Sequence, residues 1–265
     1  MKQQFYYKKV ANPSCLKPII DNWRKTLLCP HDGMWESIFQ SSSHIEIRYE
    51  NETIGYAITN GQEQLLQLYL ESEWVNLGPQ VFEEFKKVYQ ISEALIGTNN
   101  PVYQELINPF STESEVHTLL FQDSNHDEAN LLNDMIRLAW EENLEKLVSF
   151  YHESTGAPEA WLTQYLGTLI DKGELFFVER EGEIAGSCEV RLSDIYEGIA
   201  DIGMVVAPKF RSKGLGTYLL GKAKELAYDL GRKPICSCEA ENTDSERAII
   251  KNGFVSKFQI LRVKL

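Results

Sequence analysis

The stretch that decides the fold runs from Ala200 to Gly216 and reads ADIGMVVAPKFRSKGLG. Residues 202–206 are apolar and rich in β-branched side chains, which predicts a buried strand. Pro208 has no amide hydrogen, so regular strand pairing is expected to end there. Gly214 and Gly216 then allow a tight turn and a close approach of the backbone to a ligand. The stretch therefore predicts a strand that ends in a ligand-binding loop.

An amphipathic helix is predicted directly after this loop, over residues 217–230, because apolar residues recur there at helical spacing. The first N–H groups of a helix have no partner within the helix, and they lie at the positive end of its dipole. Lys209, Arg211 and Lys213 add positive charge to the same loop. A phosphate group is the expected ligand.

Two other glycine-rich phosphate loops are excluded by the residues around Gly216. A P-loop requires Gly-Lys followed by Ser or Thr, whereas Gly216 is followed by Thr217 and Tyr218. A dinucleotide-binding loop requires a third small residue at the position of Leu219. A basic turn that caps the helix and binds no ligand stays open as an alternative.

Residues 211–216, RSKGLG, resemble motif A of the GNAT acetyltransferase superfamily, whose pattern is Gln or Arg, two residues, Gly, one residue, and Gly or Ala. A second segment, from Asn242 and Ser245 to Gly253 and Phe254, resembles motif B of the same family. The resemblance covers roughly residues 129–265. It implies the GNAT fold, which is an α+β fold with a mixed, mostly antiparallel sheet flanked by helices.

The resemblance also implies an acetyl-CoA-dependent N-acetyltransferase that transfers the acetyl group directly to a small amine. The loop would hold the pyrophosphate, the end of the preceding strand would pair with the pantetheine arm, and motif B would contact the cofactor from the other side. The implied cofactor-binding residues are Met204, Val205, Val206, Arg211, Ser212, Lys213, Gly214, Leu215, Gly216, Thr217, Asn242 and Ser245.

Direct attack by an amine requires the neutral amine, so a carboxylate base is expected near the acetyl group. The candidates are Asp201, Glu189 on the preceding predicted strand, and Glu239 at the end of the next one. Family members with a glutamate on the motif A strand carry it one residue from Asp201, so alternation would turn Asp201 to the other face unless a bulge intervenes.

The family often uses a motif B tyrosine to protonate the departing thiolate, but this chain has Ile249 at that position. Tyr218 or water is then expected to protonate the sulfur, unless the thiolate leaves unassisted. A second hypothesis stays open as well, namely a non-catalytic CoA-binding or protein-interaction module. Trp161 and Tyr165 lie one turn apart on a predicted helix over 157–170, either as core residues or as an aromatic wall for the acceptor.

The first half of the chain repeats the order of elements predicted for the second, namely helix, strands, helix, strand, helix, strand. In place of the phosphate loop it has residues 71–79, ESEWVNLGP, which are acidic and lack the paired glycines. It is therefore predicted to be a degenerate GNAT-like domain. The polar segment 121–130 is the predicted linker, which gives domains 1–125 and 126–265. A helix is expected over 131–153, either continuous or split in two by a break at Asn143.

The amino-acid composition limits the expected binding partners and the expected cellular location. The net charge of −13 argues against nucleic acid or a membrane surface as the main partner and favours a cationic acceptor. The five cysteines have neither scaffold nor metal spacing, so reduced thiols and no metal site are expected. The chain shows no signal peptide and no run of about 18 apolar residues, which predicts a cytoplasmic protein. Either a monomer or a homodimer is compatible with the sequence.

Overall fold

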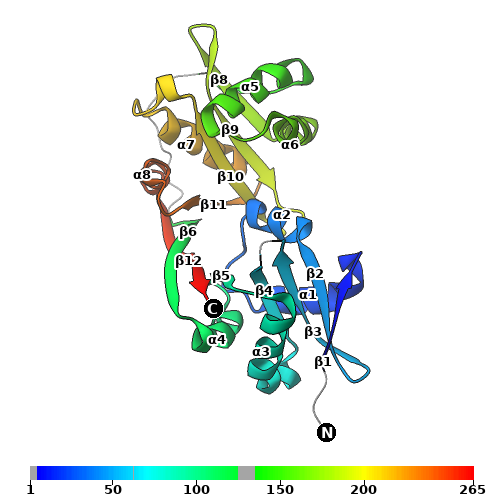
Figure 1. The fold of residues 1–265 in the computed structure, drawn as a ribbon. Coiled ribbons are helices and arrows are strands. Elements are labelled where there is room, and N and C mark those ends of the chain that lie inside the picture. The colour runs from blue at the N-terminus through cyan, green and yellow to red at the C-terminus, as the bar shows by residue number, and fades with distance from the viewer. Residues whose placement is uncertain (1–4, 62, 125–134) are drawn as a thin grey trace. The chain divides into compact units, whose positions relative to one another are not determined.

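A computed structural model describes residues 5–61, 63–124 and 135–265 (Figure 1). The chain divides into two compact units, residues 1–119 with 258–265, and residues 120–257. The domain boundary predicted after residue 125, and most of the predicted linker, fall in the segment 125–134, which lies outside the described residues, so that boundary stays a prediction.

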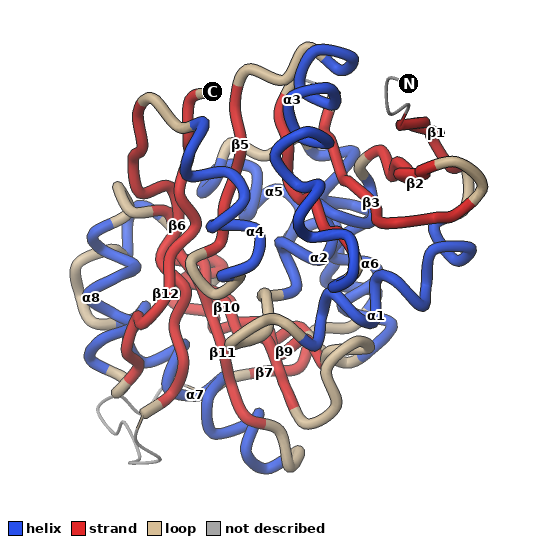
Figure 2. Tube along the Cα trace, turned by 90° about the horizontal axis from the view of Figure 1, so that it is seen from below, coloured by secondary structure: helices blue, strands red, loops and turns tan. Residues whose placement is uncertain are grey.

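The first unit is a sheet with helices, and in both units short loops join most of the elements (Figure 2). Its strand order is β1-β2-β3-β4-β5-β12. The elements from the first half of the chain are β1 (Phe5–Val10), η1 (Pro13–Leu16), α1 (Lys17–Lys25), α2 (Gly33–Ser41), β2 (Ser43–Tyr49), β3 (Glu52–Asn60), β4 (Gln64–Leu70), η2 (Ser72–Leu77), α3 (Gly78–Tyr89), β5 (Glu93–Gly97), α4 (Pro101–Ile107), η3 (Asn108–Phe110) and β6 (Glu113–Asp123).

The second unit has the strand order β6-β11-β10-β9-β8-β7. The elements from the second half of the chain are β7 (Arg137–Leu138), η4 (Glu141–Asn143), α5 (Leu144–Thr155), α6 (Glu159–Lys172), β8 (Leu175–Arg180), β9 (Glu183–Leu192), β10 (Ile199–Val206), η5 (Pro208–Phe210), α7 (Leu215–Asp229), β11 (Lys233–Glu239), α8 (Thr243–Lys251) and β12 (Phe254–Lys264). The series from β7 to β12 repeats the helix and strand order from β1 to β6, which confirms the predicted duplication and the mixed, mostly antiparallel fold.

The last strand is divided between the two units. Residues 254–257 belong to the second unit, whereas residues 258–265 belong to the first. There β12 pairs antiparallel with β5, from Ile260 opposite Gly97 to Lys264 opposite Glu93. The edge of β5 thus pairs with residues near the carboxyl end of the chain. A sequence pattern can predict that a segment is a strand, but it does not identify the strand with which that segment pairs.

The helix predicted over 131–153 is wrong in its first part. Residues 131–134 are outside the described residues, and Arg137 and Leu138 form strand β7 against Phe177 and Phe176. Trp140 then has extended backbone angles, and its N–H donates to Asn143 Oδ1 at 2.9 Å. This bond caps the short helix η4, and α5 follows it from Leu144.

Strand alternation gives the second unit two distinct faces. On β9, Gly186 faces α7, because a Cβ atom there would lie 2.6 Å from Leu219 Cδ1. Ser187, Glu189 and Arg191 point the other way, toward tyrosines of α5 and α6. Figure 1 shows α5 and α6 on one side of β8, β9 and β10, with α7 on the other. The titratable side chains of β9 therefore meet the α5 and α6 layer.

A buried ion pair between Lys224 and Asp123 connects α7 to β6 in this unit. Lys224 and Asp123 are almost fully buried, and Lys224 Nζ donates to Asp123 Oδ1 and to the carbonyl of Asn252, both at 2.9 Å. Tyr228 donates a further hydrogen bond of 2.5 Å to the other Asp123 oxygen. The aspartate thus has partners on both oxygens, as a buried charge requires.

Removing the cation should destabilise the protein strongly. Lys224→Met leaves Asp123 charged and buried, so we expect a loss of about 3–5 kcal/mol in the free energy of unfolding. Lys222→Met is the matched control, because Lys222 pairs with Glu225 at the half-exposed surface of the same helix and should cost less than about 1 kcal/mol. Urea unfolding measures both. Equal losses would contradict the assignment.

The first unit holds a histidine that should make stability depend on pH. His31 is buried between Trp23 and Phe39, and burial, with a smaller effect of the Arg24 charge, lowers its pKa from 6.5 to about 4. The unfolded chain takes up a proton near pH 6.5 that the folded chain resists until about pH 4. The free energy of unfolding should therefore fall across this interval by up to about 3 kcal/mol.

His31→Gln should remove that part of the pH dependence and leave the contribution of other groups, including His44, whose pKa burial also lowers. Chemical denaturation of both proteins at pH 7, 5.5 and 4 measures the difference. Parallel curves over the whole interval would rule out the linkage to His31.

No helix in the described segments has the length and apolar character needed to cross a bilayer. The five cysteines, all of which lie in described residues, form no disulfide.

Candidate active site

The predicted anion loop has the backbone shape that its sequence indicates. After β10 the chain passes through η5, and then Ser212 and Gly214 adopt positive φ angles of 60° and 81°. Gly214 is the N-cap of α7 and has no side chain with which to cap it. The N–H groups of the first turn of α7 therefore face the loop without a capping oxygen, which suits a bound anion.

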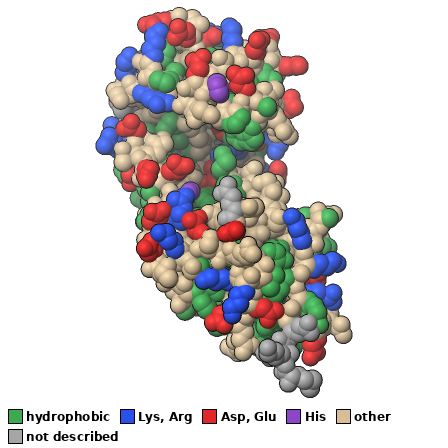
Figure 3. Space-filling model, viewed as in Figure 1, with side chains coloured by type: hydrophobic (Ala, Val, Ile, Leu, Met, Phe, Trp, Pro, Cys, Tyr) green, Lys and Arg blue, Asp and Glu red, His purple; other side chains and the backbone are tan. Residues whose placement is uncertain are grey.

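The loop is also cationic. Arg211 donates to the carbonyls of Val206 (3.1 Å) and Ser154 (2.8 Å), and Lys213 donates to the carbonyl of Lys209 (3.1 Å). Lys209 differs, because Glu181 and Glu183 neutralise it at 3.2 and 3.1 Å. Arg211 and Lys213 bond to neutral oxygens and keep an exposed positive charge beside the helix N-terminus. Over the face shown in Figure 3, acidic and basic side chains are otherwise interspersed.

Strand β10 separates from its parallel neighbour before this loop. The β10–β11 ladder joins Ile199 to Lys233, Ala200 to Pro234 and Asp201 to Ile235, and none of its pairs extends to residues 202–206 of β10. Met204, Val205 and Val206 lie beyond the last pair and are half-buried. Within the described segments, this edge of β10 therefore offers backbone donors and acceptors to an extended ligand, as the resemblance implies for the pantetheine arm.

Motif B has a capping role in the structure. Asn242 is exposed, and its Oδ1 accepts from the N–H of Ser245 at 3.1 Å, which caps α8. Ile249, at the family's tyrosine position, is buried. Asn252 donates from its Nδ2 to the carbonyl of Thr217 at 3.0 Å, so the end of α8 is fastened to the first turn of α7.

The first unit has a similar strand separation, but protein fills it. The β4–β5 ladder joins Gln64 to Glu93 and Leu65 to Ala94, with no pair further along β4. The buried Tyr103 hydroxyl donates to the Leu65 carbonyl at 3.3 Å, and the buried Asn100 amide donates to Gln67 Oε1 at 2.8 Å. With no glycine loop after β4, this half lacks both parts of the ligand cradle, in agreement with a degenerate domain.

The three candidate carboxylates lie in different surroundings. Glu239 is exposed at the end of β11. Glu189 and Asp201 are buried and point to the same face, because the β9–β10 ladder pairs Asp201 with Arg191 and Gly203 with Glu189 in unbroken register. Asp201 thus reaches the Glu189 face without a bulge.

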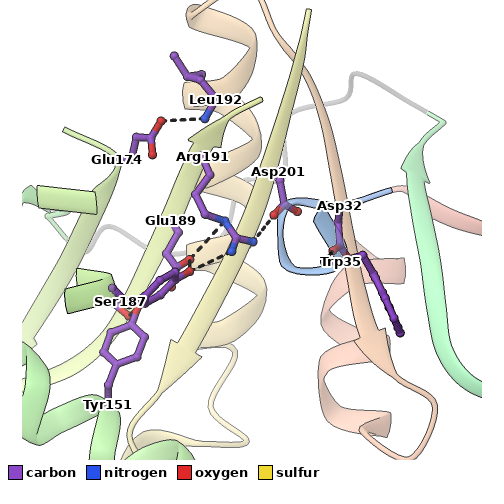
Figure 4. Close-up of polar contacts among 10 residues, drawn as sticks. Asp32, Trp35, Tyr151, Glu174, Ser187, Glu189, Arg191, Leu192 and Asp201 are labelled. Atoms are coloured by element: carbon purple, nitrogen blue, oxygen red, sulfur yellow. Dashed lines mark hydrogen bonds and ion pairs between the residues drawn. The ribbon is translucent and has the colours of Figure 1, made fainter. Parts of the chain in front are cut away.

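Glu189 and Asp201 share one guanidinium. Arg191 forms an ion pair with Asp201, and its Nε lies 3.5 Å from Glu189 Oε2 (Figure 4). Two carboxylates and one cation give the cluster a net negative charge. Across β10 the site is open at one point, because a Cβ atom on Gly203 would meet only Glu189 Oε2, at 3.9 Å.

Two tyrosines hold the Glu189 carboxylate in place. Tyr151 from α5 donates to Oε1 at 2.9 Å, and Tyr165 from α6 donates to Oε2 at 2.5 Å. Ser187 donates to the Tyr151 hydroxyl at 2.8 Å, so the Tyr151 oxygen accepts one hydrogen bond and its hydrogen is directed to Glu189. Burial, and next the Glu189 charge, raise the pKa of both tyrosines, so both phenols stay protonated and act as donors.

Sequence reasoning found part of this cluster. Glu189, Asp201, Trp161 and Tyr165 were singled out, but Tyr151, Ser187 and Arg191 were not. The alternation of Ser187, Glu189 and Arg191 on one strand is the signal that could have placed them on one face. No comparable signal ties Tyr151 to this face, because the helix pattern fits a core residue equally well.

Comparisons with known proteins agree with this geometry. Residues 12–124 match the family model described as "Acetyltransferase (GNAT) domain", and residues 132–254 match that of the "Acetyltransferase (GNAT) family". No curated protein matches the chain.

Three solved structures resemble the chain over nearly its whole length. A GNAT-family acetyltransferase from Colwellia psychrerythraea is 30% identical, with a TM-score of 0.92 over 98% of this chain and 99% of that one. A GCN5-related N-acetyltransferase from Sphaerobacter thermophilus (14% identity, TM-score 0.71, 98% and 95% coverage) and a tandem GNAT protein from the clavulanic acid biosynthesis pathway (12%, 0.66, 99% and 98%) share the fold. The chain therefore belongs to the GNAT family of acetyltransferases.

Proposed function

We propose that the protein is an acetyl-CoA-dependent N-acetyltransferase that acts on a small, cationic primary amine by direct transfer. One observation carries the proposal. Glu189 lies opposite Gly203, on the stretch of β10 that has separated from β11 and leads into the cationic loop. A carboxylate thus lies beside the unpaired edge of β10. In the proposed complex the thioester would lie along this edge and the amine would lie next to the carboxylate.

The cofactor-binding part rests on the loop and the strand. Ser212, Gly214 and the first turn of α7, with Leu215, Gly216 and Thr217, would hold the pyrophosphate, and Arg211 and Lys213 would pair with its charge. The backbone of residues 204–206 would hydrogen-bond the pantetheine arm. When bound there, acetyl-CoA supplies an activated acetyl thioester. Asn242 and Ser245 would border the cofactor from α8.

The general base is assigned to Glu189 rather than to Asp201 or Glu239. Asp201 lies opposite Arg191, forms an ion pair with it, and precedes the unpaired stretch 202–206 of β10. Glu239 is exposed at the end of β11, outside the Glu189 cluster. Glu189 is buried, is held by two neutral phenols and faces the space beside Gly203. A carboxylate in this position could take up a proton from an amine bound beside Gly203.

The acceptor class follows from charge and from the aromatic pair. The net negative cluster of Glu189, Asp201 and Arg191 favours an ammonium group. Trp161 is about half exposed and stacks on Tyr165 with ring centroids 4.8 Å apart and an interplanar angle of 11°. An exposed indole face next to buried carboxylates provides cation–π attraction for the same ammonium.

The test combines binding and turnover. Calorimetry should show acetyl-CoA binding at one site per chain, since within the described residues the glycine turn and the open strand edge occur together in the second unit alone. Release of free thiol is then followed with 2-phenylethylamine, spermidine, N-α-protected lysine and a dipeptide with a free N-terminus. Acetylation of at least one of these amines is expected. Ile249 favours a second candidate, a non-catalytic CoA-binding module, which tight binding without transfer to any amine would support.

A further inference from the structure

Glu189 is poorly placed to touch an acceptor amine by itself. Its side chain is 8% exposed, and each of its carboxylate oxygens already accepts a tyrosine hydroxyl. The low exposure of the carboxylate favours a route in which the amine proton reaches it through an intermediate group. The two hydroxyls in contact with Glu189 are the candidates for that group.

The two tyrosines differ in access. Tyr151 is 3% exposed, and its oxygen accepts from Ser187, which is itself fully buried. Tyr165 is half-buried and carries the exposed Trp161 ring on its face. Of the two tyrosines, Tyr165 is the one next to solvent-accessible surface. It also contacts Trp161, beside which the acceptor is proposed to bind.

The hydrogen-bond directions at Tyr165 are fixed by its neighbours. Arg191 Nη1 lies 2.9 Å from the Tyr165 oxygen, and since a guanidinium can only donate, the phenol accepts there. The single hydroxyl hydrogen of Tyr165 is then committed to Glu189 Oε2. A phenol oxygen has two lone pairs, so one remains to accept an N–H from a bound amine.

On the basis of the proposed function, we infer that Tyr165 is a catalytic residue that relays a proton from the acceptor nitrogen to Glu189. An acceptor ammonium donates its proton to the Tyr165 oxygen while the Tyr165 hydrogen passes to Glu189 Oε2, which leaves a neutral amine. Arg191 is a positioning residue, because its bond to the phenol oxygen orients the hydroxyl hydrogen toward the carboxylate.

The transfer then balances without a further reactant. The amine lone pair attacks the thioester carbonyl carbon, a C–N bond forms and the C–S bond breaks. The nitrogen loses its second proton to the departing sulfur, which gives an amide and a free thiol. Glu189 returns the first proton to solvent. This route needs no hydroxyl on α8, which accords with the buried Ile249.

The burial of the phenol supports a relay over direct deprotonation by a tyrosinate. Burial, and then the charge of Glu189, raise the pKa of Tyr165, so the free tyrosinate is not available at neutral pH. The other charged groups that face it are Arg191 and Asp201 on the two strands, and they pair with each other. The nearby neutral partner is Tyr151 on α5.

Tyr165→Phe tests the relay, with Tyr151→Phe as the matched control. Both remove one hydroxyl from Glu189, but only the first breaks the path to the amine. With the best acceptor of the amine panel at pH 7, we expect kcat/KM of Tyr165→Phe to fall by about 10²-fold. The value should then rise with pH until the amine deprotonates in solution. Tyr151→Phe also takes a hydrogen bond from Glu189, but it keeps the path through Tyr165 and should lose less kcat/KM without that continuous rise.

Two results would overturn the inference. One is a Tyr165→Phe enzyme with wild-type kcat/KM, and the other is a reduced enzyme whose pH profile runs parallel to the wild type, since that marks a structural role. Circular dichroism and acetyl-CoA calorimetry of each variant show that the fold and the cofactor site are intact. A wild-type protein that acetylates no amine of the panel would instead refute the proposed function, so the two failures are distinguishable.

Discussion

Glu189→Gln should lower kcat for acetyl transfer by about 10²- to 10⁴-fold, the usual contribution of a positioned general base. The amide keeps the size of the side chain and can still accept one tyrosine hydroxyl, but it cannot take up a proton. Because the cofactor loop is formed by other residues, the affinity for acetyl-CoA should not change. Steady-state kinetics with the best acceptor of the amine panel, together with calorimetry, measure the two quantities.

Glu239→Gln is the matched control for that experiment. It makes the same chemical change at the exposed end of β11, and it should leave kcat unchanged. Asp201→Asn gives an intermediate case, because it releases Arg191 from its ion pair and alters the charge around Glu189. If Glu189→Gln retained nearly full kcat while Asp201→Asn lost it, the base would have to be reassigned to Asp201.

Gly214→Glu should weaken acetyl-CoA binding by roughly 10²-fold or more, since like charges brought together in a binding site cost several kcal/mol. A Cβ atom at position 214 would meet no atom within 4 Å in the described residues, so the start of the new side chain has room. The φ of 81° does strain most side chains, and that effect needs its own control.

Gly214→Asn and Gly214→Gln separate strain from charge. Asparagine tolerates positive φ better than other residues, so its variant should bind acetyl-CoA most like the wild type. Glutamine has the strain and size of glutamate without its charge, and it should fall between the two. Equal affinities for the Gln and Glu variants would show that the loop does not face a phosphate.

The cofactor side of the site was largely predictable from sequence, because it is local in the chain. The apolar strand, Pro208, Gly214 and the amphipathic run of α7 are consecutive, and each constrains its own backbone. Their order alone predicted the strand, the turn with positive φ and the uncapped helix start. Whether residues 211–217, Asn242 and Ser245 contact a cofactor stays a prediction.

The catalytic side could be predicted only in part, because it is assembled from separate elements. Glu189 and Asp201 were candidates from their strands, but three partners of Glu189 come from α5, α6 and the next residue on the same face of β9. A helix pattern shows that Tyr151 is on an apolar face without naming its partner. Register, which pairs Asp201 with Arg191, depends on hydrogen bonds between strands that no local pattern encodes.

By itself, the sequence determined the duplicated order of helices and strands and the position of one glycine turn before a helix in the second half, since periodicity, proline and glycine act on their immediate neighbours. Only the tertiary structure decided that protein fills the strand separation of the first half, that residues 260–264 pair with β5, and that Tyr165 bonds to both Arg191 and Glu189. These features depend on contacts between residues far apart in the chain, which packing and strand register fix together.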